Sequence, residues 1–103
     1  LVRSPDPDWL RRLRLDLGFF GARGITAQDG LMESDLDEAQ LKRDMVRVSA
    51  QVVGLVDASK FGTTFFSVFA LPSEIDRIIT DTAAPASAVD ALRALDIAVD
   101  SVD

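Results

Sequence analysis

The sequence predicts an α/β fold: a Rossmann-like, mostly parallel sheet flanked by helices in three layers. Three short apolar runs, at residues 15–20, 52–56 and 75–80, end at glycine or aspartate, as is typical of buried strands followed by loops. An amphipathic helical pattern separates the first two runs. A strand, a helix and a second strand form a βαβ unit, whose strands are parallel with a right-handed crossover.

The N-terminal part begins with an irregular or extended segment at residues 1–8, because Pro5 and Pro7 oppose regular structure. A short helix is expected over Trp9–Leu13. The first strand, Leu15–Phe20, is followed by a small-residue loop at 21–24. Residues 26–30 are polar and turn-like.

The central helix is expected from Leu36 to Ala50. Its apolar positions recur at i, i+4 and i+7 and would form one buried stripe, comprising Leu41, Met45 and Val48. Its start carries a capping-box pattern. The expected N-cap is Ser34 or Asp35, with Asp37 or Glu38 as the partner three residues on.

The second half alternates strands with helical segments. Three strands are expected after the helix, at 52–56, 75–80 and 97–102, the last of them alternating and near a sheet edge. A short strand is expected at 65–71, a helical turn at 72–74, and a helix at 85–95 with Val89, Leu92 and Leu95 on one face.

Composition excludes several classes of chemistry. The 103 residues suit one domain, the net charge is −6, and cysteine, histidine and tyrosine are absent. Disulfides, thiolate or imidazole metal sites and Ser-His or Cys-His catalysis are therefore excluded, and we expect no catalytic residue, metal or cofactor. The acidic balance disfavours direct binding of nucleic acid. No apolar run reaches the length of a membrane span, and no signal peptide is evident, so we expect a cytoplasmic protein without membrane contact.

Polar residues follow three of the predicted strands. Because ligands bind beyond the carboxyl ends of parallel strands, these loops would share one edge of the sheet. The edge would offer two cations, two carboxylates, two hydroxyls and a small-residue loop that a ligand can approach closely. The residues are Gly21, Arg23, Gly24, Asp57, Ser59, Lys60, Thr80 and Asp81. This set suits a polyhydroxylated anion.

Each of these residues also has a structural explanation. Asp57 and Ser59 could cap the turn after their strand, and Lys60 could be an ordinary solvated lysine. Arg23 could pair with Asp29 or Glu33. Lys42 could form an i, i+4 ion pair with Glu38 on the helix surface. The phenylalanines between positions 61 and 69 suit a core or an interface better than a stacking platform.

The order and spacing of many short motifs carry a family resemblance. They run Asp16-Leu17-Gly18-Phe19-Phe20-Gly21-Ala22-Arg23-Gly24-Ile25, Gly30-Leu31, Glu38-Ala39, Lys42-Arg43, Met45, Asp57-Ala58-Ser59-Lys60-Phe61-Gly62 and Glu74-Ile75-Asp76 to Ile79-Thr80-Asp81. From about Leu15 to the end, the chain resembles the C-terminal sensor domain of DeoR-family bacterial transcriptional regulators. The resemblance implies a domain that binds a phosphorylated sugar or related metabolite and changes the DNA affinity of an attached winged helix-turn-helix.

The same resemblance implies that residues 1–103 are the C-terminal part of one effector-sensing domain, roughly its last two thirds. Neither the DNA-binding domain nor the glycine-rich phosphate-binding segment of such a protein is visible in the sequence. DNA would therefore be bound only through a domain outside this chain. We also expect a homo-oligomer, and an alternative role for the chain is oligomerisation itself, through the stretch Phe61–Phe69.

The fold group of such sensor domains includes ribose-5-phosphate isomerase, and the comparison opposes an enzyme. The enzymes' Asp-x-Ser-Lys motif is kept as Asp57, Ser59 and Lys60. Phe20, Arg23 and Glu33 replace their loop aspartates and loop lysine, and Lys42 stands where they have a catalytic glutamate. A protonated lysine cannot act as the required base, but it can hold a phosphate or hydroxyl oxygen. The resemblance thus adds Lys42 to the effector contacts. An isomerase-like enzyme remains the alternative, with Asp57 or Glu33 as its base.

Overall fold

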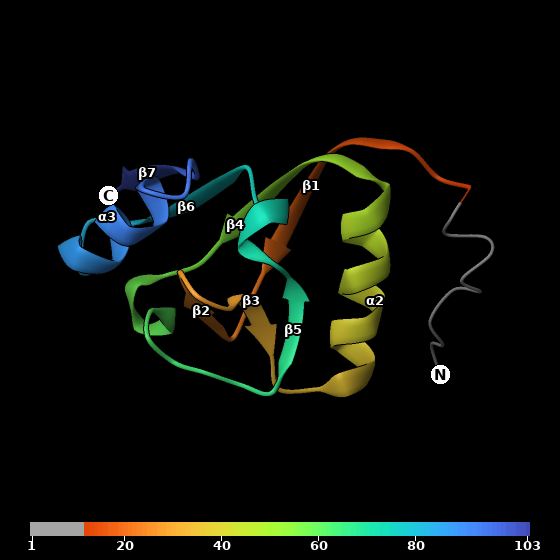
Figure 1. Cartoon of the computed structure of the whole chain (residues 1–103), viewed down its shortest axis with the longest axis horizontal. Helices are drawn as coiled ribbons and strands as arrows, with labels where there is room; N and C mark the ends of the chain where they lie inside the picture. The colour runs from red at the N-terminus through yellow and green to blue at the C-terminus, as the bar shows by residue number, and fades with distance from the viewer. Residues whose placement is uncertain (1–11) are drawn as a thin grey trace.

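The computed structural model describes residues 12–103 and contains the predicted parallel sheet (Figure 1). Neighbouring strands are parallel throughout, in the order β1-β4-β6-β7. Their bounds are β1 (Leu15–Gly21), β4 (Ser49–Leu55), β6 (Arg77–Asp81) and β7 (Ala98–Val102). The alternating last strand lies at a sheet edge, as predicted. The segment at 1–8 and most of the helix expected at Trp9–Leu13 lie outside the described residues.

A second, antiparallel sheet was not predicted. Its three strands follow the order β2-β3-β5, with bounds β2 (Gly24–Thr26), β3 (Gly30–Glu33) and β5 (Ser67–Ala70). The turn expected at 26–30 is present and joins β2 to β3. The Thr26 hydroxyl accepts a hydrogen bond from the Asp29 amide at 2.9 Å. Gly30 has a φ of +93°, which favours glycine.

The central helix α2 (Leu36–Val48) is shorter than predicted, because Ser49 and Ala50 already belong to β4. Asp35 occupies the N-cap position, but its side chain makes no capping hydrogen bond, so the capping-box prediction is wrong. The buried stripe is also rotated. α2 packs mainly against β5. Val48 of the predicted stripe is buried, together with Ala39 and Val46, whereas Leu41 and Met45 are half-buried.

The remaining bounds agree with the predictions to within three residues, and the helical turn at 72–74 agrees at both ends. Two short 3₁₀ helices, η1 (Ala58–Lys60) and η2 (Pro72–Glu74), precede β5 and β6. The last helix, α3 (Ala86–Arg93), buries Val89 and Leu92. It ends before Leu95, which is 49% exposed and does not share their buried face.

The core lies on one face of the parallel sheet. Phe20, Val52, Ile78 and Val99 point from that face into one buried cluster, which also holds residues of both helices and of the antiparallel sheet: Ile25, Leu31, Val46, Phe69, Val89 and Leu92. On the opposite face, large apolar side chains are exposed, namely Leu17, Phe19, Leu55 and Val102. Residues 12–103 therefore cover one side of the sheet only and do not supply the predicted third layer. Within this range, no helix is both long and apolar enough to cross a membrane.

Candidate functional site

The parallel register brings the three predicted loops to one edge of the sheet. Gly21 at the end of β1 pairs with Leu55 at the end of β4, and Leu55 pairs with Ile79 near the end of β6. The polar residues that follow these strands therefore start from adjacent positions. The predicted placement of the site residues at one sheet edge follows from this register.

Asp57 caps the η1 turn that follows β4. Its Oδ1 accepts hydrogen bonds from the Ser59 amide at 2.8 Å and from the Ser59 hydroxyl. These two hydrogen bonds, the one from the hydroxyl first, hold the pKa of the Asp57 carboxyl below its ordinary value. The structural explanation is thus correct for Asp57, whereas Ser59 donates to that cap and is not itself one. An exposed, ionised carboxylate remains at the edge.

Asp81 ties two of the loops together. Its Oδ2 accepts a hydrogen bond from the Ala58 amide at 3.1 Å, and its Oδ1 accepts one from the Ala83 amide at 2.9 Å. The carboxylate therefore fixes η1 relative to the end of β6. Neighbouring Thr80 is 3% exposed and faces the core, and its hydroxyl has no hydrogen-bond partner.

Two cations at this edge form no ion pair within residues 12–103. Arg23 is exposed, and neither of its expected partners binds it, since Asp29 bonds Thr26 and Glu33 bonds Lys42. The Lys60 ammonium likewise forms no ion pair with a described residue, although its charge helps to lower the pKa of Asp57. The backbone of Lys60 is held, because its amide donates to the Asp57 carbonyl at 3.1 Å. A cation without a close ion-pair partner, on a fixed backbone, is a suitable anion ligand.

Lys42 reaches from α2 to the end of β1. Its Nζ donates to Glu33 Oε2 at 2.6 Å and to the Gly21 carbonyl at 2.8 Å, and lies 5.2 Å from the centre of the Phe69 ring. Glu38, the expected i, i+4 partner, is farther away, at 3.6 Å. Because Glu33 is only 4% exposed, the Glu33–Lys42 pair is largely removed from water.

The two glycines of the 21–24 loop differ in their surroundings. A Cβ on Gly24 would lie 2.2 Å from the Thr63 carbonyl oxygen, whereas a Cβ on Gly21 would meet nothing within 4 Å. The chain that follows η1 is thus packed tightly against β2. The Gly62 amide strengthens this contact by donating to the Ile25 carbonyl at 3.0 Å.

The candidate residues form two groups along the edge. One joins Gly21, Lys42 and Glu33, and the other joins Asp57, Ser59, Ala58 and Asp81. No hydrogen bond between side chains of the described residues connects the groups. Glu33 was considered as a partner of Arg23, as the residue in place of a loop lysine and as a candidate base, and its pairing with Lys42 was missed. Residues 12–103 contain no cluster of His, Cys, Asp or Glu that could hold a metal ion.

The described residues thus form an α/β unit with a one-sided parallel sheet, and the edge at which such sheets bind ligands carries cations, carboxylates and the Ser59 hydroxyl. The chain belongs to the family described as the DeoR C terminal sensor domain, whose model matches residues 1–82. The expected family is therefore confirmed. The extent expected for the match was wrong, because it begins at residue 1 and ends at residue 82 instead of running from Leu15 to the C-terminus.

Curated relatives of the chain are transcriptional regulators. It is 38% identical over 81 residues to the HTH-type transcriptional regulator GlpR of Haloferax volcanii, covering 79% of this chain and 32% of that protein. It is 34% identical over 85 residues to the glycerol-3-phosphate regulon repressor of Escherichia coli K12, covering 82% and 34%. A putative aga operon transcriptional repressor of Escherichia coli O157:H7 is 31% identical over 84 residues, covering 82% and 31%. The chain thus spans about a third of the length of these relatives.

Proposed function

We propose that this chain is the effector-binding part of a cytoplasmic transcriptional repressor, in which a phosphorylated sugar or related metabolite alters DNA binding by an attached domain. The observation that carries the proposal is the pair of cations, Arg23 and Lys60, that form no ion pair with residues 12–103 at the carboxyl edge of the sheet. The name of one relative, a glycerol-3-phosphate regulon repressor, supports a phosphorylated effector.

The roles of the edge residues follow from their chemistry. Lys60 and Arg23 would hold the phosphate, and the backbone of Gly21 and Gly24 would line the pocket. Asp57 and Ser59 would bond the sugar hydroxyls, because a carboxylate accepts and a hydroxyl can do both. Lys42 has three N–H donors, of which Glu33 and Gly21 take two, so one remains for the effector.

A receptor fits the described residues better than an enzyme. Aldose–ketose isomerisation needs a carboxylate that takes up a proton near neutral pH. Hydrogen bonds from Ser59 lower the pKa of Asp57, which makes it a weak base. Glu33 is buried and its Oε2 is bonded to Lys42 at 2.6 Å. Both candidate bases are therefore engaged in structural roles, and no separate observation favours the isomerase alternative.

The exposed apolar face of the sheet supports a larger, three-layer domain. Leu17, Phe19 and Leu55 lie on the same face of the adjacent strands β1 and β4, and Val102 lies on that face of the edge strand β7. Apolar surface of this kind is normally covered. We infer that segments outside residues 12–103 cover it in the complete Rossmann-like domain. DNA would be bound by a further domain.

The test of this function is a DNA-binding titration of the intact regulator. Fluorescence anisotropy with its operator would be measured against a panel of phosphorylated sugars and polyols, each with its unphosphorylated parent as control. We expect at least one phosphorylated compound to change the operator affinity by about fivefold or more, the lower range of allosteric coupling. The proposal fails if no phosphorylated compound acts, or if the protein converts one by a reaction that Asp57→Ala abolishes.

A further inference from the structure

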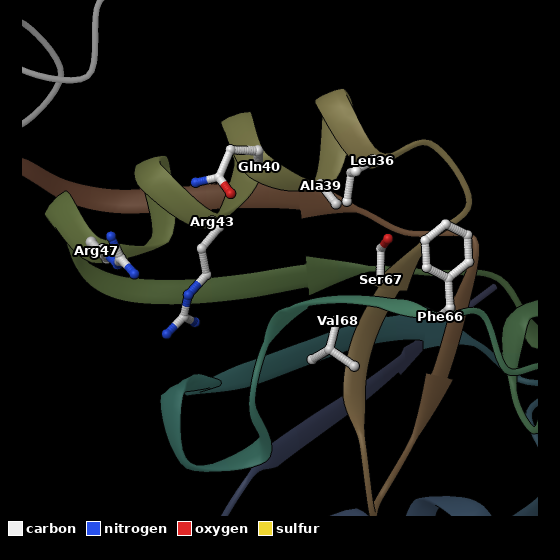
Figure 2. A pocket seen from close by; sticks show the side chains of 8 residues that line it. All are labelled: Leu36, Ala39, Gln40, Arg43, Arg47, Phe66, Ser67 and Val68. Atoms are coloured by element: carbon white, nitrogen blue, oxygen red, sulfur yellow. The ribbon is translucent and has the colours of Figure 1, made fainter.

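A groove with unlike ends lies between α2 and β5, on the side of α2 away from Lys42. It has a volume of about 380 Å³, which lies within the range of pockets that bind small molecules. Figure 2 shows Leu36 and Phe66 together at one end and Arg43 and Arg47 at the other. Phe66 is 79% exposed and Leu36 is 64% exposed, the two highest values for large apolar side chains among the described residues. The apolar end is therefore open to a ligand.

The cationic end of the groove has unused hydrogen-bond donors. Arg47 makes no hydrogen bond to a described residue, and its nearest carboxylate oxygen, on Asp44, is 3.8 Å away. Arg43 is held in place, but its hydrogen bonds to Glu74 and to the Phe69 carbonyl both use Nη1. Its Nη2 and Nε are left for another partner. Planar guanidinium groups hold carboxylates through paired N–H donors, so this end suits a carboxylate.

Two carboxylates of the protein lie beside this end. Asp44 and Glu74 pair with Arg47 and Arg43, respectively. Neither carboxylate lines the groove, and the charged side chains that do so among the described residues are the two arginines. The contact of Arg47 with Asp44 is loose, and the Arg47 side chain is 55% exposed. A carboxylate in the groove would replace this loose contact with a hydrogen-bonded one.

Ser67 adds an unpaired polar group to the β5 wall of the groove. Its residue is 7% exposed, and its hydroxyl oxygen has no hydrogen-bond partner among the described residues. Figure 2 shows this oxygen directed from β5 toward α2. A buried hydroxyl without a partner is unfavourable. A polar ligand atom at this place would supply the missing hydrogen bond.

We propose that the groove binds a small carboxylate with an aromatic body. The carboxylate lies at Arg47 and at Nη2 of Arg43, and the ring stacks on Phe66 and covers Leu36. Leu36 and Arg43 are seven residues apart, about 10 Å along the helix axis at 1.5 Å per residue, so a chain of a few atoms joins the ring to the carboxylate. The site is separate from the proposed effector site, because neither Lys42 nor any residue at the carboxyl ends of the parallel strands lines it.

Calorimetric titration of the intact regulator with phenylbutyrate tests whether the groove recognises both ends of such a ligand. Phenylbutanol keeps the ring and lacks the charge, and butyrate keeps the charge and lacks the ring. We expect a Kd of about 1 mM for phenylbutyrate, in line with the binding energy available to a ligand with so few atoms. Each of the two control compounds should bind at least about tenfold more weakly.

Four variants locate the binding in the groove. Arg47→Gln and Phe66→Ser should each weaken the binding of phenylbutyrate about tenfold, because each removes the protein group at one end. Asp44→Asn removes a competing carboxylate and should strengthen binding about twofold, as befits a loose surface ion pair. Arg77→Gln is the matched control, since Arg77 pairs with Asp100 outside the groove, and it should leave the affinity unchanged.

Ser67→Ala distinguishes a ligand contact from a structural role. The variant deletes a hydroxyl that has no partner in the described structure, so the free energy of unfolding should not fall, whereas phenylbutyrate should bind about threefold more weakly. The proposal is overturned if phenylbutyrate shows no saturable binding, or if phenylbutanol or butyrate binds as tightly. It is also overturned if Arg47→Gln leaves the affinity unchanged, or if Arg77→Gln lowers it as much.

Discussion

Replacing Lys42 by methionine is expected to lower the free energy of unfolding by about 3 kcal/mol, the range found when one partner of a buried ion pair is removed. The variant leaves Glu33, which is 4% exposed, without the ammonium that now lies 2.6 Å from its Oε2. It also removes the donor to the Gly21 carbonyl. Urea denaturation followed by circular dichroism measures the change.

Lys60→Met is the matched control, because Lys60 forms no ion pair with the described residues. Its unfolding free energy should change by no more than about 0.5 kcal/mol, as for most surface substitutions. A second control combines Lys42→Met with Glu33→Leu. Replacing both partners by apolar groups removes the stranded carboxylate and should recover most of the lost stability. Equal losses for the two lysine variants would contradict a structural role for the Glu33–Lys42 pair.

Gly24→Ala is expected to destabilise the chain by about 3 kcal/mol, the upper part of the range for inserting a methyl group into packed structure. The new Cβ would lie 2.2 Å from the Thr63 carbonyl oxygen, and a backbone atom cannot move aside as a flexible side chain can. Either β2 or the segment after η1 must shift. Thermal and urea unfolding both report the loss.

Gly21→Ala separates stability from binding in the same loop. A Cβ there has free space, so the unfolding free energy should stay within about 0.5 kcal/mol of the wild type. If the effector approaches the backbone of Gly21, the added methyl group should still weaken effector binding in the intact regulator. Equal destabilisation by Gly21→Ala and Gly24→Ala would contradict the conclusion that the close approach of Thr63 makes position 24 intolerant of a side chain.

The parallel sheet was predictable because its strands are apolar runs of ordinary length, bounded by glycine or aspartate. The antiparallel sheet was not. β2 and β3 contain three and four residues, and so few positions cannot display a two-residue period. β3 is buried at all four positions, including Glu33, which interrupts the apolar pattern that would mark a strand. The buried face of α2 was misjudged because β5, an element of that second sheet, decides which stripe is covered.

In the candidate site, too, contacts between residues close in the sequence could be predicted, and contacts between distant residues could not. The capping of η1 by Asp57 involves a residue two positions away, and the residue types alone suggested it. The hydrogen bond from the Ala58 amide to Asp81 joins residues 23 positions apart. The pairing of Lys42 with Glu33 joins α2 to the sheet that was not predicted. Local spacing favoured Glu38 as the partner of Lys42, but only the tertiary fold brings Glu33 closer.

The most direct test of the account is calorimetric titration of the intact protein with a phosphorylated metabolite and with its unphosphorylated parent, for the wild type and for Lys60→Met. We expect the wild type to bind the phosphorylated form at least about tenfold more tightly, a difference of 1.4 kcal/mol, and Lys60→Met to lose that preference while remaining folded. Equal affinity of the wild type for both forms, or an undiminished preference in Lys60→Met, would contradict an anion site at the carboxyl edge of the sheet.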